Sequence, residues 1–305
     1  MAAAELAAKA PGSPVTRQAS GTRPPAWPES ALRKTAPQVS VVIPARDEGE
    51  RICAVLDRLF ASVRRSAEVL VVVDSPADST VAAVHGYAPP GGDRARPRLR
   101  CLVNEYGSGP ASAIRFGFDR AVAPVIVVVM ADGCDDTTQV DDLALRVESG
   151  AVVAAASRYA HGGSQLGGPL LKRTLSRLAG VSLRVLAGAG TSDATNSFKA
   201  YSAEFVAAAG VQSRRGFSVG LELTAKARRL RLPVAEIPTS WQERRSGRSG
   251  FRLVRWLPGY LRWYLYCFGP RRRAERAPDC AEGPVLRAND RAGGAMLRPG
   301  GAAGG

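Results

Sequence analysis

An apolar run that ends in closely spaced carboxylates is the part of the sequence best suited to chemistry. Residues 127–136 read VVVMADGCDD, so Asp132 follows the run and Asp135 and Asp136 come soon after it. Oxygen ligands of this kind suit a hard divalent cation such as Mg²⁺ or Mn²⁺. Met130 stands where a second ligand would be expected, and its thioether is a poor ligand for such a cation. The stretch therefore predicts a metal-binding corner that depends mainly on Asp132.

Asp136 is the second candidate metal ligand, and it has two interpretations. It can fill a further position on the metal, or it can cap a helix that begins near QVDDLALRV at 139–147. Asp135 has the same alternative as a residue of a capped helix start. The sequence leaves both interpretations open.

Polar groups also follow the other apolar runs of strand length. The run at 39–45 leads into PARDE, the run at 68–74 ends in Asp74, the run at 99–104 ends in Asn104, and the run at 124–131 comes directly before Asp132. One Asp after a strand is often a turn residue or a helix cap. Because parallel strands bring their carboxyl ends to one edge of a sheet, four such groups predict one crevice. Its ligand would carry hydroxyls, amides and a metal-bridged phosphate.

The elements that position these groups alternate along the chain. Helical spacing follows the first run at Ile52, Val55, Leu56, Leu59 and Phe60, and a further run of strand length occupies 151–157. Another helix is expected to start near Pro110. Continuous Val and Ile runs alternating with helices are typical of a buried parallel sheet. We therefore expect an α/β fold, doubly wound, with helices on both faces of a mostly parallel sheet.

The charge of the chain points to an anionic partner. The chain has 305 residues and a net charge of +15. Residues 244–273 contain nine Arg and no Asp or Glu, interleaved with Trp, Tyr and Phe. Arginine with Trp and Tyr is typical of a segment that lies on an anionic membrane surface. A helix in the core or in a dimer is the other interpretation of WLPGYLRWYLYCF at 256–268. Nucleic acid is disfavoured as a partner by the carboxylates of the first half.

Composition also predicts the domain organisation and the compartment. We interpret residues 1–37 and 270–305 as disordered tails, 38–250 as one domain and 251–269 as an amphipathic segment. Five widely spaced Cys without a CxxC disfavour a disulfide framework or a zinc site and favour a reducing cytosol. No signal peptide is visible, and no run is long enough to span a membrane. We therefore expect a cytoplasmic protein, peripheral at the inner face of the membrane.

Known phosphate-binding loops do not account for the crevice. There is no GxxxxGK[ST], and the glycines of NEYGSGPASAIRFG fail the dinucleotide fingerprint because Ser112 takes its last position. Gly107 and Gly109 have two interpretations. They form an ordinary turn into a helix, or they present backbone N–H groups to a phosphate.

Eight motifs in order resemble the family 2 glycosyltransferases, and most closely the dolichyl- or polyprenyl-phosphate mannose synthases. They cover roughly residues 39–252 and are VSVVIPARDEGERI, VVVDSPADST, NEYGSGPASAIRFGFDRA, VVVMADGCDD, ASRY with GG, SDATNSFKAYS, GFSVGLELTAKARRL and IPTSWQERRSGRSGF. The resemblance implies a GT-A fold, a nucleotide-sugar donor and a divalent metal.

The resemblance also implies roles for single residues. Pro44, Ala45 and Glu48 would hold the nucleoside, and Asp74 would contact its base or ribose. Ala131 and Asp132 match the last two residues of the family's DxD, so Asp132 would bind the metal on the diphosphate. Arg158 matches a catalytic Arg in SRY. The acceptor phosphate would be held by Arg173, by Arg244 (which also counts as catalytic) and by Ser249 in a closing loop.

Three departures from the family pattern stand out. The DxD reads MAD, with Met130 in place of the first Asp. The second-strand motif, usually DDGS, reads DSPADST, and Gly250 replaces a Lys after the closing-loop Ser. These changes bear on the donor and on the acceptor.

The chemistry favours a phosphate as acceptor. A hydroxyl acceptor needs a base, whereas a phosphate is already ionised and needs cations to hold it. The chain has only two His, His85 and His161. We therefore expect an inverting glycosyltransferase that moves a hexose, with mannose as first candidate, from a GDP- or UDP-sugar to polyprenyl phosphate. A soluble acceptor and a non-catalytic nucleotide-sugar-binding homologue remain as alternatives.

Overall fold

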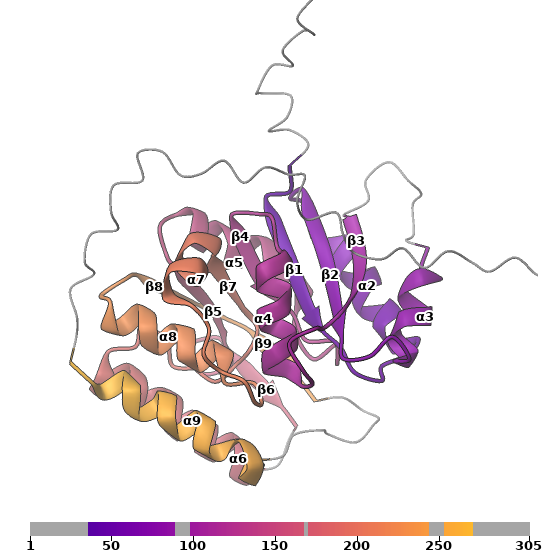
Figure 1. Ribbon diagram of the computed structural model, residues 1–305. Helices are drawn as coiled ribbons and strands as arrows, with labels where there is room; N and C mark the ends of the chain where they lie inside the picture. Colours follow the sequence, from indigo (N-terminus) through magenta and orange to yellow (C-terminus); the bar gives the residue numbers. More distant parts are fainter. Residues whose placement is uncertain (1–35, 89–97, 168–169, 244–252, 271–305) are drawn as a thin grey trace, which may run out of the picture.

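A seven-stranded sheet runs through the middle of the molecule (Figure 1). The computed structural model describes residues 36–88, 98–167, 170–243 and 253–270. The strand order is β3-β2-β1-β4-β7-β5-β8. The strands are β1 (Val39–Pro44), β2 (Ala67–Val73), β3 (Arg98–Val103), β4 (Val125–Val128), β5 (Val153–Ser157), β7 (Lys199–Ser202) and β8 (Val234–Pro238).

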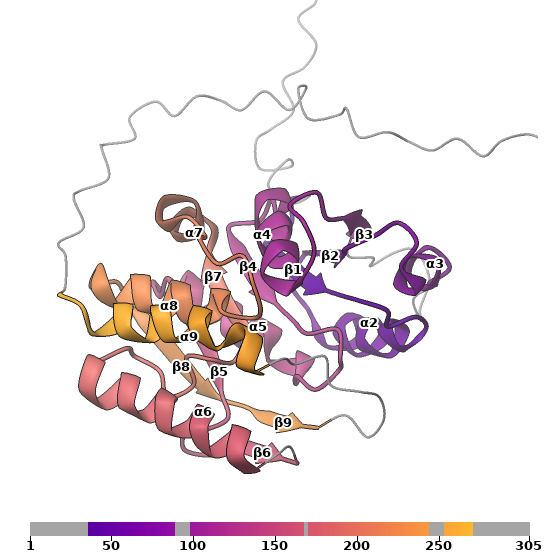
Figure 2. The same cartoon turned by 60° about the horizontal axis from the view of Figure 1, so that its bottom comes forward.

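The sheet is mostly parallel. β1 pairs in parallel with β2 and β4, β2 with β3, and β5 with β8, whereas β7 is antiparallel to both of its neighbours. The carboxyl ends of β1, β2, β3 and β4 therefore lie at one edge, which Figure 2 brings forward. The expected α/β fold with a mostly parallel sheet is confirmed.

Helices cover both faces of this sheet because the strands are apolar on both sides. Alternate residues of β1 divide between two cores, with Val41 and Ile43 on one side and Val42 on the other. The first core contains α2 (Arg51–Ser62), α3 (Ser79–His85) and α5 (Val140–Glu148). The second contains α4 (Pro110–Arg120), α7 (Ala203–Ala209) and α8 (Val219–Arg229).

Close packing of α4 on the sheet depends on a glycine. A Cβ at Gly117 would lie 2.3 Å from a methyl of Val42, so only Gly lets the helix approach β1 at this point. Pro110 occupies the first turn of the same helix, where its missing N–H costs no intrahelical bond.

A smaller layer lies beside the carboxyl edge of the sheet. The short strands β6 (Ser164–Leu166) and β9 (Ser240–Gln242) pair in parallel there. α6 (Leu170–Ser182) continues into a π-helical turn, η3 (Leu183–Ala187). α9 (Leu253–Phe268) packs against α8. A third core joins η3, α8 and α9, with Leu183 of η3 and Leu221 of α8 packed against Trp263 and Cys267 of α9.

The five strands expected from apolar runs are present with shifts of one or two residues at most ends. β4 is the exception, because it ends at Val128 rather than at residue 131. The N–H of Met130 donates to the carboxylate of Asp135 instead of to a neighbouring strand. The helix near Pro110 and the helix over 139–147 are confirmed as α4 and α5.

The domain boundaries fall partly on residues that the structure does not describe. Most of the expected tails, 1–35 and 271–305, lie outside the described residues. The amphipathic segment expected at 251–269 contains α9, which has one side in the third core. None of the described helices is long and apolar enough to cross a membrane.

Candidate active site

The loop after β4 holds Asp132 at the carboxyl edge of the sheet. Its side chain is partly exposed, and Oδ1 accepts a hydrogen bond from the N–H of Cys134 at 3.0 Å. Gly133 has a φ of 71°, and its carbonyl accepts from Nη2 of Arg58 at 2.9 Å. A Cβ at Gly133 would lie 2.6 Å from that nitrogen. The loop is therefore fixed by its own backbone and by α2.

Asp135 anchors the same loop through its buried carboxylate. Its side chain is buried, and Oδ2 accepts the N–H of Met130 at 2.9 Å. Burial, and secondly the nearby charge of Asp132, raise the pKa of Asp135 to about 7. Asp135 thus shapes the turn that carries Asp132.

Asp136 caps the short 3₁₀ helix η2 (Thr137–Gln139). Its Oδ1 accepts the N–H of Thr138 at 3.1 Å and the hydroxyl of the same residue at 2.6 Å. This geometry matches the helix-cap interpretation. The role of Asp136 as a metal ligand stays a prediction.

The donor set fits a metal that is shared with a ligand. Among the described residues, no group of three or more His, Cys, Asp or Glu side chains could hold a metal ion. Asp132 is partly exposed in this loop, and so is Met130 two residues before it. Mg²⁺ and its relatives accept one or two carboxylates when phosphate oxygens supply further ligands. The residues present therefore fit a divalent cation bound together with a diphosphate.

The end of β1 and the loop after it contain the three residues expected to hold a nucleoside. Pro44 ends the strand, Ala45 is buried and donates its N–H to the carbonyl of Val72, and the N–H of Glu48 donates to Oγ1 of Thr80. The carboxylate of Glu48 pairs with Arg51 at 3.4 Å. The loop is thus tied to β2 and to the start of α3.

Asp78 supports this loop from the altered second-strand motif. Both of its carboxylate oxygens accept the N–H of Asp47, at 3.2 and 3.0 Å. Oδ1 also caps α3 through the N–H of Thr80 at 2.8 Å. DSPADST therefore keeps one carboxylate that joins the loops after β1 and β2.

Asp74 orders the glycine-rich turn before α4. Its Oδ2 accepts the N–H of Gly109 at 2.8 Å, and its Oδ1 accepts from Nδ2 of Asn104 at 3.2 Å. Asn104 also donates to the carbonyl of Gly107 at 2.6 Å. The strand-end groups Asp74 and Asn104 therefore meet, as the strand order predicts. A contact between Asp74 and a base or ribose stays a prediction.

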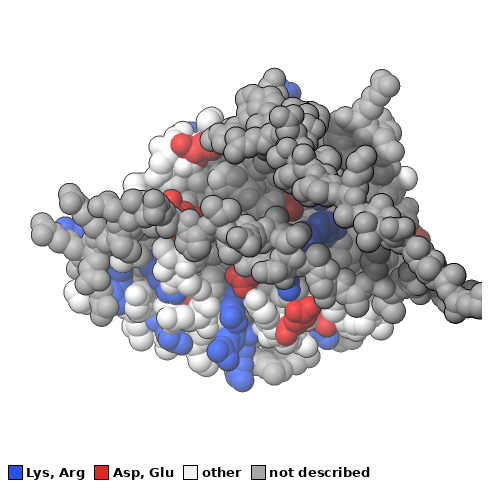
Figure 3. Space-filling view, turned by 45° about the horizontal axis from the view of Figure 1, so that its top comes forward, with Lys and Arg blue, Asp and Glu red and all other residues white. Residues whose placement is uncertain are grey.

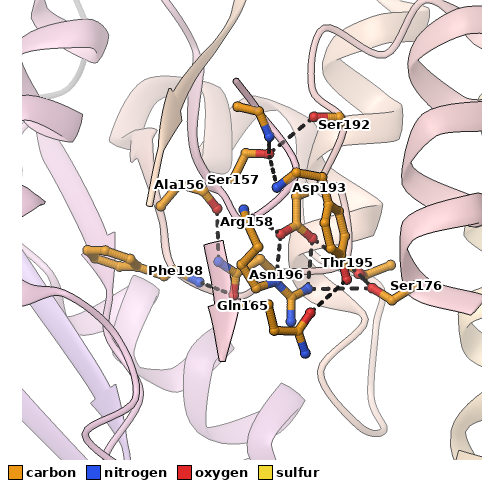
Figure 4. A network of polar contacts seen from close by, with 12 residues as sticks. Ala156, Ser157, Arg158, Gln165, Ser176, Ser192, Asp193, Thr195, Asn196 and Phe198 are labelled. Carbon is orange, nitrogen blue, oxygen red and sulfur yellow. Dashed lines mark hydrogen bonds and ion pairs between the residues drawn. The ribbon is translucent and has the colours of Figure 1, made fainter. Parts of the chain in front are cut away.

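Arg158 follows β5 and forms a buried ion pair with Asp193 (Figure 4). Its Nε and Nη2 donate to the two carboxylate oxygens at 2.7 and 2.8 Å, and its backbone N–H donates to Oδ2 at 3.0 Å. Burial would lower the pKa of Arg158, but the hydrogen bonds and charge of Asp193 outweigh it and raise the pKa. The guanidinium is held rigidly at the carboxyl end of β5.

Hydroxyl groups extend this ion pair toward α6. Ser176 of α6 lies 3.5 Å from Nη2 of Arg158 and shares a 2.8 Å hydrogen bond with Thr195 (Figure 4). Ser157 and Ser192 are 3.2 Å apart on the other side. The segment 191–196 is therefore joined to β5 and to α6.

Two further charged groups complete the cluster, and sequence reasoning missed both. Lys199 of β7 is fully buried and donates through Nζ to the carbonyls of Asp193, Ala194 and Asn196. Burial lowers its pKa to about 8. Glu236 of β8 accepts from Ser192, and hydrogen bonds outweigh its burial and lower its pKa. The motif SDATNSFKAYS contained the signal, because a Lys inside an apolar strand needs buried partners.

The residues expected at the acceptor phosphate are only partly described. Arg173 is exposed on the first turn of α6. Arg244 and Ser249 lie outside the described residues. Ala131 is buried directly before Asp132. The structure thus brings Asp132, Asp74 and Arg158 to strand ends at one edge of the sheet, and leaves the closing loop undescribed.

Comparison with known proteins identifies the class. Residues 40–208 match the model of Glycosyl transferase family 2, so the chain belongs to this family and is a glycosyltransferase. It is 28% identical over 211 residues to the polyprenol monophosphomannose synthase of Mycolicibacterium smegmatis, covering 68% of this chain and 79% of that one. It is 26% identical over 224 residues to the undecaprenyl-phosphate mannosyltransferase of Micrococcus luteus, covering 70% and 86%.

Solved structures support the GT-A fold. Glucosyl-3-phosphoglycerate synthase from Mycobacterium tuberculosis, in complex with Mn²⁺, UDP and glucosyl-3-phosphoglycerate, superposes with a TM-score of 0.57. The identity is 17%, and 81% of this chain and 86% of that one are covered. The expected GT-A fold and the family are therefore confirmed.

Proposed function

We propose that this glycosyltransferase moves a hexose, with mannose as first candidate, from a nucleoside-diphosphate sugar to a polyprenyl phosphate. The observation that carries the proposal is the similarity to two relatives named for polyprenol and undecaprenyl phosphate, over most of both chains. The site supports it with the partly exposed carboxylate of Asp132 after β4 and the rigidly held guanidinium of Arg158 after β5.

The donor would bind at the loops after β1, β2 and β4. Pro44, Ala45 and Glu48 would enclose the nucleoside, with Asp74 beside them. Asp132 would hold Mg²⁺ or Mn²⁺ on the diphosphate, and a bound cation would neutralise the charge that develops on the leaving group. The bond between the anomeric carbon and the diphosphate oxygen breaks, and its electron pair leaves with the nucleoside diphosphate.

The acceptor would attack from the opposite side of the anomeric carbon. A phosphate oxygen forms the new bond there, so the configuration inverts and no proton has to be removed. This agrees with the His positions, because His85 is exposed at the end of α3 and His161 is exposed in the turn after β5. Arg173, Arg244 and Ser249 are our candidates for holding the acceptor phosphate, and Arg158, which Asp193 holds in place, is a candidate catalytic residue.

The protein would work peripherally at the cytoplasmic face of a membrane, where such an acceptor resides. The exposed apolar residues Leu257, Leu261 and Leu265 of α9 support surface attachment, because exposed apolar side chains of a helix that lies along a bilayer can enter its interface.

A donor and acceptor screen tests the proposal. The full chain is incubated with GDP-mannose, UDP-glucose or UDP-GlcNAc and a polyprenyl phosphate, with Mg²⁺, with Mn²⁺ or with EDTA. We expect metal-dependent formation of a lipid-linked sugar from one donor, and much less with Asp132→Asn. Transfer only to 3-phosphoglycerate or another soluble acceptor would replace the polyprenyl phosphate in the proposal. Asp119→Asn, on the exposed side of α4, serves as the matched control.

A further inference from the structure

Three side-chain oxygens in the described part of the chain are buried and take part in no hydrogen bond: Oε1 of Gln139, Oγ1 of Thr239 and Oδ1 of Asp141. Oδ1 of Asp141 lies 3.5 Å from Nη1 of Arg65, so that carboxylate has an ion pair. The oxygens of Gln139 and Thr239 have no comparable partner among the described residues. Because buried polar groups are normally hydrogen-bonded, these two oxygens indicate a ligand.

Gln139 and Thr239 meet at Pro238, the last residue of β8. Nε2 of Gln139 donates to the carbonyl of Pro238 at 2.7 Å, and Thr239 is the next residue of the chain. Thr239 is only 4% exposed. Its N–H donates to the carbonyl of Ser157 and its carbonyl accepts the N–H of Ser164, both at 2.9 Å, so only its hydroxyl is left for a ligand. We call Gln139 and Thr239 the polar pair.

The polar pair joins the segment that carries Asp132 to the strand end that carries Arg158. Gln139 is the last residue of η2, the short helix that follows the Asp132 loop. Ser157, which Thr239 contacts through the backbone, directly precedes Arg158 (Figure 4). Because β7 is antiparallel to both β4 and β5, and β8 is parallel to β5, the carboxyl ends of β4, β5 and β8 lie at one edge of the sheet.

The chemistry of the polar pair suits a hydroxyl group. An amide oxygen only accepts hydrogen bonds, whereas a Thr hydroxyl both donates and accepts, so one ligand hydroxyl can satisfy both residues. Basic and acidic side chains at an exposed surface, such as those in Figure 3, can bond to water instead. In the proposed reaction the hexose is bonded to the diphosphate that Asp132 would hold, and its anomeric carbon has to reach Arg158. A hydroxyl of that hexose is therefore the ligand group that the position favours.

We propose that the polar pair binds a hydroxyl of the donor's hexose and so helps to determine which sugar is transferred. The inference rests on the proposed function and deepens it, because the other candidate residues bind the nucleoside, the metal or the acceptor. The sugar hydroxyl donates to Oε1 of Gln139 and accepts from the hydroxyl of Thr239. A sugar without a hydroxyl at that position leaves both groups unpaired, and buried unpaired groups are what lets a site reject such an analogue.

Titration calorimetry of the full chain, with Mn²⁺ and without an acceptor, tests this inference. The probes are GDP against GDP-mannose and UDP against UDP-glucose, so that each nucleotide sugar is compared with its own nucleoside diphosphate. Thr239→Val removes the hydroxyl, Thr239→Ser keeps it, and Gln139→Met removes Oε1. Thr224→Val is the matched control, because Thr224 is a fully buried Thr of α8 whose hydroxyl donates to the carbonyl of Gly220 at 2.7 Å.

We expect Thr239→Val and Gln139→Met to bind the nucleotide sugar roughly fivefold to tenfold more weakly, and the nucleoside diphosphate as tightly as the wild type does. Thr239→Ser should bind both like the wild type. Thr224→Val should lower Tm and leave both affinities unchanged, whereas Thr239→Val should not lower Tm, since its hydroxyl has no protein partner among the described residues. Two results overturn the inference: unchanged binding of the nucleotide sugar, as an ordered water at the polar pair would give, or an equal loss for sugar and diphosphate.

Measurement of binding without an acceptor separates this inference from the proposed function. Weaker binding of the nucleotide sugar by Thr239→Val, with no transfer to polyprenyl phosphate by the wild type, refutes the proposed function alone. Transfer by the wild type, with unchanged binding of the nucleotide sugar in both variants of the polar pair, refutes this inference alone. Binding of no nucleotide sugar refutes both.

Discussion

Removal of the Asp193 carboxylate gives the sharpest test of the site architecture. Asp193 is fully buried and meets Arg158 with two side-chain hydrogen bonds, at 2.7 and 2.8 Å, and one from the backbone. The Arg158 side chain is itself only 12% exposed. In Asp193→Ala the guanidinium therefore stays buried without its counter-charge.

The loss of stability expected for Asp193→Ala follows from the burial of the Arg158 side chain. Breaking a buried ion pair by removing one partner costs about 3–5 kcal/mol, because the remaining charge is left uncompensated. In a domain of 150–250 residues each kcal/mol lowers Tm by about 2–4 °C, so Asp193→Ala should lower Tm by roughly 6–20 °C. This is a large part of the roughly 5–15 kcal/mol that stabilises a folded protein.

Urea unfolding followed by circular dichroism measures the loss. Arg158→Leu with Asp193→Leu removes both charges, and we expect it to be more stable than Asp193→Ala because no lone charge remains. Asp119→Asn, at an exposed carboxylate paired with Tyr106, should stay within about 0.5 kcal/mol of the wild type. A loss below about 1 kcal/mol in Asp193→Ala, or a double variant less stable than it, would refute the reasoning.

Four further predictions concern the same edge of the sheet. Asp132→Asn should lower transfer by about a hundredfold or more with Tm nearly unchanged, and equal transfer rates would contradict the metal role. The pKa of Lys199 is about 8 in the folded protein and 10.5 in the unfolded chain, so the unfolded state binds more protons between these pH values. The free energy of unfolding of the wild type should therefore rise with pH over this range, and Lys199→Met should lack that rise. Unfolding free energies from pH 7.5 to 10.5 test this, and a constant difference between the two proteins would contradict it. Gly133→Ala should lower the free energy of unfolding by about 1–2 kcal/mol, because φ at this position is 71° and the new Cβ would displace Arg58. A Tm within 1 °C of the wild type, roughly the experimental error, would count against this reasoning. Met130→Asp should lower the Mn²⁺ concentration for half-maximal transfer about tenfold, whereas a raised requirement would show that residue 130 does not face the metal.

The sequence predicted the first half of the fold well for a physical reason. Continuous Val and Ile runs such as 68–74 can be buried only inside a sheet covered on both faces, and the intervening helices show a regular apolar spacing. The strand-end groups Asp74 and Asn104 could then be placed at one edge from topology alone. Their contact at 3.2 Å agrees with that reasoning.

The second half was harder to predict because its stability depends on polar groups. β7 is only four residues long and contains the fully buried Lys199, which interrupts the apolar pattern. Its partners, including Asp193, lie in a loop with no periodicity. The resemblance selected SDATNSFKAYS as a motif, but the ion pair of Asp193 with Arg158 depends on three-dimensional contacts. α6 was missed because the exposed Leu175 and Leu178 stand among its polar residues, which blurs the expected polar outer face.

The altered DxD can be understood from the separate tasks of its carboxylates. Asp135 holds the backbone N–H of Met130, and Asp136 caps the next helix, so the shape of the loop does not depend on the side chain at position 130. Replacement of an Asp by Met at that position therefore removes a candidate ligand and leaves the turn that presents Asp132 in place. A cation held by one carboxylate depends more strongly on the diphosphate for its remaining ligands. It follows that metal and donor should bind together, and that either alone should bind much more weakly than both.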